Sequence, residues 1–211
     1  MNRLIYRTFI FCCFIGSFCM AAPEPSIIPV RGQWTLDVEF THLQPIILDT
    51  IEGGNPIRFW YTIFTVTNNT GNDVDFFPNC QLLTNTFEIE AAGAGVSPTV
   101  FQYIKKRHQS EYPFLESLSN VGNRILEGED NAKDIAVIWS DFDHKASSIK
   151  VFITGLSNET AAVNLPVFQN DSLSQKQVFL RKTLEISYSV MGDPTGISSR
   201  LEYTGKRWIM R

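Results

Sequence analysis

The strongest hydrophobic pattern in the chain is a run of β-branched and aromatic residues, Ile57–Thr67, interrupted only by Arg58. Its apolar side chains occupy both alternating faces: Ile57, Phe59, Tyr61 and Ile63 on one, Trp60, Phe64 and Val66 on the other. A strand that is apolar on both faces is typical of the interior of a fold. Asn68-Asn69-Thr70-Gly71 tolerates positive φ and ends the strand. This run is therefore predicted to be the central strand of a β-sandwich.

Shorter strand patterns recur on both sides of this run. Gln33–Leu43 alternates between apolar and polar residues, which predicts a strand with one solvated face. Further strands are predicted at Pro45–Ile51, Thr86–Ala91, Asp134–Ser140 and Ser148–Thr154. Closely spaced strands with turn residues between them are typical of an all-β sandwich or barrel.

Two segments depart from this rhythm. Ser97–His108 predicts one short helix that crosses between the sheets, because Ser97 suits a helix N-cap and Pro98 suits the first helical position. The polar segment Asn158–Asp171 is expected to be an external loop.

The chain closes with a long C-terminal strand pair, predicted at Gln175–Val190 and Ile197–Met210. In the second strand the apolar parity switches between Tyr203 and Trp208, although a regular strand keeps a side-chain period of two. A β-bulge at Thr204-Gly205-Lys206 would allow the switch. With such a bulge, both aromatic side chains are expected to be buried.

The first 21 residues, 1–21, have the pattern of a signal peptide. Arg3 and Arg7 precede the apolar run Thr8–Met20, and small residues lie at a cleavage site before Ala22. This run is shorter than the roughly 20 residues that a membrane-spanning helix needs. The sequence therefore predicts export to the periplasm or the extracellular space, with no transmembrane segment after the signal peptide is removed.

Removal of the signal peptide sets the domain organisation. Residues 22–32, with three prolines, are expected to form an extended tether, and residues 33–211 a single β-sandwich domain. Without Arg3 and Arg7, 16 of the 18 basic residues remain against 22 acidic ones, a net charge of −6. An acidic chain gives no electrostatic reason to expect nucleic-acid binding.

Three of the four cysteines leave with the signal peptide, so Cys80 has no partner for an intramolecular disulfide. No histidine is near it in sequence, and no Gly-x-Ser-x-Gly motif is present. We therefore expect Cys80 to be a small buried apolar residue rather than a nucleophile. No cofactor and no catalytic residue is predicted.

The best candidate for a metal site is the acidic segment after the Asp134–Ser140 strand. Asp141 and Asp143 share parity there, and His144 follows them. Carboxylates from the preceding turn could complete a site for Ca²⁺ or zinc: Glu127, Glu129 or Asp130. We take Asp141, Asp143, His144 and Glu129 as the candidate ligands. The alternative is a solvated strand end whose carboxylates tolerate substitution.

Three segments together resemble a known group of proteins. They are Asn68–Pro78, Leu126–Phe142, and Phe179–Pro194 with the ending Arg207–Arg211. The first two resemble immunoglobulin-like modules, in which such a strand end and a Gly-Glu turn lead into a core strand, although Glu127 replaces a common proline. All three together resemble uncharacterised secreted proteins of planctomycete-type bacteria. The resemblance implies an immunoglobulin-like β-sandwich and an exported protein, without a particular activity.

The leading functional hypothesis is an exported, non-catalytic β-sandwich of the cell envelope that binds protein or an envelope polymer. One alternative is a metal-assisted hydrolase that uses the Asp141, Asp143 and His144 cluster. Another is a proteinase-inhibitor-like domain, since the chain also resembles small β-sandwiches of that class. The sequence leaves the oligomeric state open.

Overall fold

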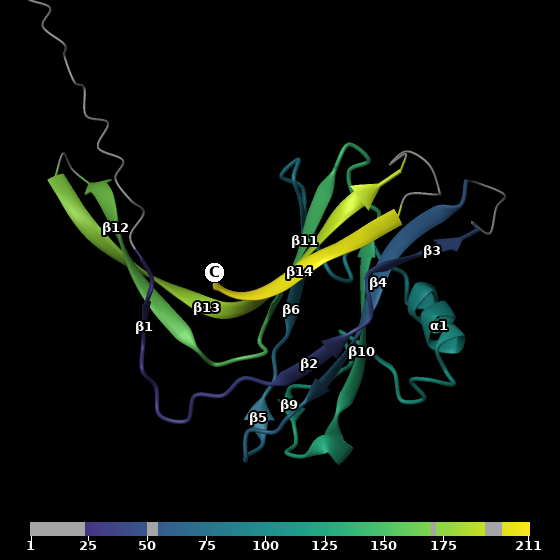
Figure 1. Cartoon of the computed structure of the whole chain (residues 1–211), viewed down its shortest axis with the longest axis horizontal. Helices are drawn as coiled ribbons and strands as arrows, with labels where there is room; N and C mark the ends of the chain where they lie inside the picture. Colours follow the sequence, from purple (N-terminus) through teal and green to yellow (C-terminus); the bar gives the residue numbers. More distant parts are fainter. Residues whose placement is uncertain (1–23, 50–54, 170–171, 193–199) are drawn as a thin grey trace, which may run out of the picture.

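The computed structural model describes residues 24–49, 55–169, 172–192 and 200–211. The predicted signal peptide, residues 1–21, lies outside the described residues. Within the described parts of the chain, no helix is long and apolar enough to cross a membrane. The described residues form an all-β sandwich with one α-helix, as the sequence predicts (Figure 1).

The first sheet is built around β4 (Ile57–Thr67), the predicted central strand. One edge of β4 pairs with β10 (Lys133–Ser140) in antiparallel register. The other edge pairs first with β3 (Gln44–Leu48) and then with β2 (Asp37–Phe40). The short strand β8 (Glu116–Ser117) runs parallel to β10 and completes the sheet. The prediction of a central strand is confirmed.

The second sheet is built around β13 (Ser172–Met191), the longest strand. Its partners and their neighbours are β1 (Ser26–Ile27), β6 (Asn79–Thr84), β7 (Ile89–Ala91), β11 (Ser148–Thr154), β12 (Thr160–Gln169) and β14 (Arg200–Met210). β5 (Val74–Asp75) and β9 (Arg124–Ile125) form a separate antiparallel pair, and a single 3-10 turn, η1, spans Glu129–Asn131.

Both faces of β4 are buried because a helix covers the outer face of its sheet. Trp60, Phe64 and Val66 pack between the two sheets. The opposite face of β4 packs against α1 (Pro98–Arg107) and its surroundings. The Ser97 hydroxyl caps this helix by accepting a hydrogen bond from the Thr99 amide (3.3 Å). The predicted helix is confirmed, and it lies between β7 of one sheet and β8 of the other along the chain.

β13 belongs to two parts of the molecule. Its second half lies inside the sandwich, between β11 and β14. Its first half, Ser172–Arg181, pairs with β12 and projects from the sandwich as a two-stranded extension, which we call the arm (Figure 1). The expectation of a loop at Asn158–Asp171 was therefore wrong. Ten residue pairs join β12 to β13, and six of the ten residues of β12 are apolar, so the polar residues of the segment lie mainly at its two ends.

The C-terminal pair contains the predicted bulge. Ser187 pairs with Gly205 but Tyr188 pairs with Tyr203, so Thr204 is the additional residue. The expected burial of both aromatic side chains was wrong, since Tyr203 and Trp208 are 37% and 39% exposed. β14 is an edge strand, and one side of each ring stays open to solvent. Tyr203 still contacts the rings of Phe40 and Tyr188.

Candidate functional site

The structure gives Asp141 a role in the core rather than at a metal site. Its Oδ1 atom accepts hydrogen bonds from Arg58 Nε (2.9 Å) and Trp60 Nε1 (2.8 Å). Arg58 is buried, and its guanidinium lies 5.2 Å from the centre of the Trp60 ring. Phe142 stacks on the same ring. The carboxylate therefore compensates a buried cation and a buried indole N–H, and from these contacts we expect a substitution of Asp141 to be destabilising.

The other candidate ligands are only partly brought together. His144 Nε2 lies 3.0 Å from Asp141 Oδ2, on the exposed side of the cluster. Asp143 instead accepts from the Lys145 amide (2.9 Å). Glu129 lies in η1, at the opposite end of β10 from Asp141. Among the described residues, no group of three or more His, Cys, Asp and Glu side chains is placed to hold a metal ion.

Cys80 lies in β6, within the core between the sheets, and is 4% exposed. Burial raises the pKa of its thiol to about 12. The thiolate is the nucleophilic form of cysteine, and it is negligible at neutral pH when the pKa is this high. The position of Cys80 agrees with its interpretation as a small buried apolar residue.

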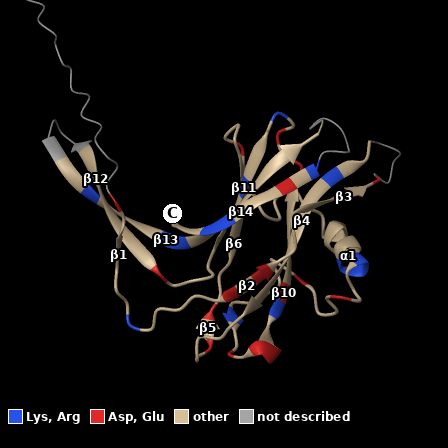
Figure 2. Ribbon diagram, in the orientation of Figure 1, with Lys and Arg blue, Asp and Glu red and all other residues tan. Residues whose placement is uncertain are grey.

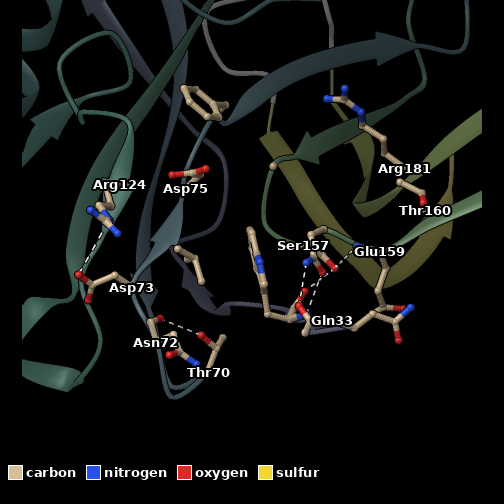
Figure 3. A pocket seen from close by; sticks show the side chains of 16 residues that line it. Gln33, Thr70, Asn72, Asp73, Asp75, Arg124, Ser157, Glu159, Thr160 and Arg181 are labelled. Atoms are coloured by element: carbon tan, nitrogen blue, oxygen red, sulfur yellow. Dashed lines mark hydrogen bonds and ion pairs between the residues drawn. The ribbon is translucent and has the colours of Figure 1, made fainter. Parts of the chain in front are cut away.

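A cleft lies where the arm joins the sandwich, and sequence analysis did not identify it. This junction cleft has a volume of about 740 Å³. One wall consists of residues 32–34, 155 and 157–160 with Arg181, and the other of residues 70, 72–75 and 77 with Arg124 (Figure 3). The two walls come from segments far apart in the sequence, so no local motif marks the cleft.

Hydrogen bonds make the first wall rigid. Asn158 Oδ1 accepts from the Trp34 amide (2.8 Å), and Asn158 Nδ2 donates to the Gly32 carbonyl (2.9 Å). The Ser157 hydroxyl donates to the Trp34 carbonyl (2.8 Å). These bonds tie the connection between β11 and β12 to the segment that precedes β2. The Trp34 side chain is thereby held at the edge of the cleft.

Glu159 is held at the same wall by a charged partner. Lys182 Nζ donates to its Oε1 atom, and so does the hydroxyl of Thr35 (3.0 Å). The hydrogen bond from Lys182 holds the pKa of Glu159 below its usual value, and the bond from Thr35 adds to this effect. Glu159 is therefore ionised at neutral pH, with its charge balanced by Lys182.

The second wall is organised by Asn68, which is fully buried at the end of β4. Its Nδ2 atom donates to the carbonyls of Asn72 (2.8 Å) and Ile125 (3.0 Å), and its Oδ1 atom accepts from the Thr70 hydroxyl (2.7 Å). These bonds fix the loop after β4 against β9. As a result, Asp73 faces Arg124 across 3.9 Å, with both side chains well exposed.

The walls meet where Gly155 touches Phe77. Gly155 has a φ of +88°, and a Cβ atom there would lie 2.8 Å from the Phe77 carbonyl carbon and 3.0 Å from Pro78 Cα. Only glycine fits this contact without displacing the backbone. The backbone of Phe77 is held in place, while its side chain remains 66% exposed at the cleft.

The arm carries a second candidate surface, the outer edge of β13. Arg181 exchanges two backbone hydrogen bonds with Arg211, the last residue beside β14, whereas the Lys182 amide bonds to Glu159 on the β12 side. Backbone groups of a strand alternate in direction. The N–H and C=O groups of Gln175, Gln177 and Phe179 therefore point away from β12, where no described strand pairs with them.

Comparison with known proteins adds no relative to this description. No protein-family model, no curated protein and no solved structure matches the chain.

Proposed function

We propose that this protein is an exported, non-catalytic binding protein that captures an extended acidic polypeptide segment of another protein along the outer edge of the arm. The observation that carries the proposal is the outer edge of β13 between Ser172 and Leu180, where none of the strands that the structure describes is paired. β14 pairs with β13 only from Lys182 to Met191. An open strand edge is a template for strand addition, in which main-chain hydrogen bonds supply affinity.

The low stability expected of a two-stranded arm favours a bound partner. A two-stranded ribbon is marginally stable in water, and a third strand with an apolar contact stabilises it. Phe179, on the open edge, is 63% exposed, and Leu165 on β12 is 39% exposed. An added strand would cover Phe179. It would make the outer part of the arm three-stranded and the base, where β1 already pairs with Ala161 and Ala162, four-stranded.

The two edges of the arm differ, and the difference favours the β13 edge as the place where a strand can be added. On β12, Pro166 lacks an N–H group, and its register places it on the edge that faces away from β13. β1 occupies the same edge at Ala161 and Ala162. The open edge of β13 contains no proline between Ser172 and Leu180. One edge is thus blocked and the other is available.

Charge selects the kind of partner. The two strands of the arm, Thr160–Gln169 and Ser172–Arg181, contain Lys176 and Arg181 and no acidic residue (Figure 2), while Asp171, between them in the sequence, lies outside the described residues. If two copies paired antiparallel along this edge with Lys176 at the twofold axis, the two lysines would lie opposite each other, and like charges across a strand pair destabilise it. An acidic segment of a different protein avoids this repulsion.

A library of displayed linear peptides selected on the purified protein tests the proposal. We expect the selected peptides to be extended and rich in Asp or Glu. Gln177→Pro should reduce their affinity about tenfold or more, because it removes an outward N–H group and places a ring in the path of the added strand. Lys176→Glu should also weaken binding, because it reverses the favourable charge.

Gln177→Ala is the matched control, since it keeps the backbone N–H and should bind like the unmodified protein. Thermal unfolding of all variants should be unchanged, because the arm lies outside the sandwich core. Equal affinity of Gln177→Pro and Gln177→Ala would contradict strand addition at this edge. A dimer in light scattering that becomes monomeric with Gln177→Pro would show that a second copy, not an acidic partner, occupies the edge.

Export is the other part of the proposal, and the sequence alone supports it. The resemblance to secreted proteins with immunoglobulin-like modules points in the same direction. We expect the intact mass of the protein recovered from its native envelope or medium to correspond to a chain beginning at or near Ala22. A mass that includes Met1 would contradict export by signal-peptide cleavage.

A further inference from the structure

We propose that the junction cleft is a second binding site, which takes a neutral, hydroxyl-rich ligand, a segment of an oligosaccharide. The cleft lies at the base of the arm, apart from the open edge of β13, so this inference does not depend on the proposed peptide binding. Its volume of about 740 Å³ lies within the range of small-molecule sites, about 300–1,000 Å³.

The charges that line the cleft exclude a simple ionic ligand. Asp73 and Asp75 lie on one wall with Arg124, and Arg181 and Glu159 lie on the other (Figure 3). Glu159 is already balanced by Lys182, which leaves two carboxylates and two guanidinium groups. An anion near Arg124 would also meet Asp73, whose carboxylate lies 3.9 Å from the guanidinium, and a cation near Asp73 would meet Arg124. Neither an anionic nor a cationic ligand would therefore be surrounded only by groups of the opposite charge.

Hydroxyl groups fit this mixture, because each one both donates and accepts a hydrogen bond. A sugar hydroxyl can donate to a carboxylate of one wall while a neighbouring hydroxyl accepts from a guanidinium of the other. Asp75 and Arg181 are available for this purpose. No hydrogen bond or ion pair joins either side chain to another described residue, and both are exposed.

Two aromatic side chains add an apolar surface. Phe77 presents 66% of its side chain to solvent, and Trp34 is half-buried in the opposite wall. A sugar ring has one face of C–H groups that packs on an aromatic ring while its hydroxyls project toward polar groups. An exposed phenylalanine is otherwise an unfavourable surface, and a bound ring would remove it from water.

The cleft is also arranged before any ligand binds. The Asn158 and Ser157 bonds fix the wall of Trp34, Asn68 fixes the wall of Asp75, and the Gly155 contact sets Phe77 between them. A site with fixed walls loses little conformational entropy on binding. This rigidity distinguishes the cleft from an irregular gap between the arm and the sandwich.

The test begins with an array of neutral, acidic and amino oligosaccharides, followed by titration of the best neutral glycan by calorimetry. Phe77→Ala and Asp75→Asn should each reduce its affinity about tenfold or more, the effect of losing one well-placed contact. Phe114→Ala and Asp130→Asn are the matched controls, since Phe114 is 82% exposed and Asp130 is exposed, and both lie outside the cleft. They should leave the affinity unchanged.

Tryptophan fluorescence provides a second readout. Titration with the same glycan should change the emission of the unmodified protein, and Trp34→Phe should remove most of this change. Trp208→Phe should preserve it, because Trp208 is similarly accessible but lies on β14, outside the cleft. Unchanged thermal unfolding of each variant verifies that the fold is intact.

Several results would overturn the inference. They are an array that binds no glycan or only acidic or amino glycans, an affinity that Phe77→Ala and Asp75→Asn leave unchanged, and displacement of the glycan by inorganic phosphate. The last result would identify Arg124 and Arg181 as an anion site. Peptide binding at the arm would be unaffected by any of them, so the two proposals can fail separately.

Discussion

Replacing Gly155 with alanine is expected to lower the free energy of unfolding by about 2–6 kcal/mol. Two effects contribute. The positive φ of Gly155 strains any residue with a Cβ atom, at about 1–3 kcal/mol. The added methyl group also meets the backbone of Phe77 and Pro78, and overpacking of this kind costs about 1–3 kcal/mol. Backbone atoms cannot rotate away as a side chain can. Chemical denaturation of the purified protein measures the change.

Gly122→Ala separates the two effects. Gly122 also has a positive φ, +79°, but a Cβ atom there would meet nothing within 4 Å. This control should therefore show the strain without the clash, and Gly155→Ala should be the more destabilising variant. Equal losses at the two positions would mean that the chain near Phe77 yields easily, and that the two walls of the cleft are not fixed against each other.

Replacing Asp141 with alanine is expected to lower the free energy of unfolding by about 3 kcal/mol. The substitution takes the carboxylate away from Arg58, which is 8% exposed, and removes the acceptor of the Trp60 N–H. The Arg58 Nε–H and the Trp60 Nε1–H both lose this acceptor inside the protein, and each buried donor left without one costs about 1–3 kcal/mol, or about 2–6 kcal/mol together. Asp141 itself is 25% exposed, which places the expected value at the lower end of this range.

His144→Ala is the control for this prediction. His144 contacts the other oxygen of Asp141 from the exposed side, so its loss should cost no more than about 1 kcal/mol. A loss for Asp141→Ala as small as that for His144→Ala would show that the carboxylate is not the main partner of Arg58. An unchanged melting temperature with a chelator is expected in both variants and in the unmodified protein, and a decrease would favour the metal hypothesis.

The features that sequence analysis predicted correctly depend on neighbouring residues. The two apolar faces of Ile57–Thr67 follow from a side-chain period of two, and the helix at Pro98–Arg107 from a cap and a proline at its start. The bulge at Thr204 was predicted because the apolar positions change from one strand face to the other between Tyr203 and Trp208, which a regular strand does not allow. In each case the deciding information lies within a few residues of the feature.

The features that sequence analysis missed depend on contacts between distant segments. β12 was predicted to be a loop because the ends of its segment, Asn158-Glu159 and Asn170-Asp171, are polar, and it is a strand because β13 lies beside it. The acidic turn looked like a metal site or a solvated end because Asp141 gives no local sign of Arg58, which lies 83 residues earlier. Trp208 looked buried because parity shows which face a side chain takes, but not whether another layer covers that face.

By itself, the sequence determined the all-β class, the central strand, the helix and the bulge, because side-chain periodicity and helix capping depend on neighbouring residues. The tertiary structure alone decided where the chain leaves surfaces open. The free edge of β13 exists because β14 pairs with only half of that strand, and the junction cleft exists because Gly155 brings two distant segments together. Such surfaces arise from how elements are arranged in space, and no pattern within a single element encodes them.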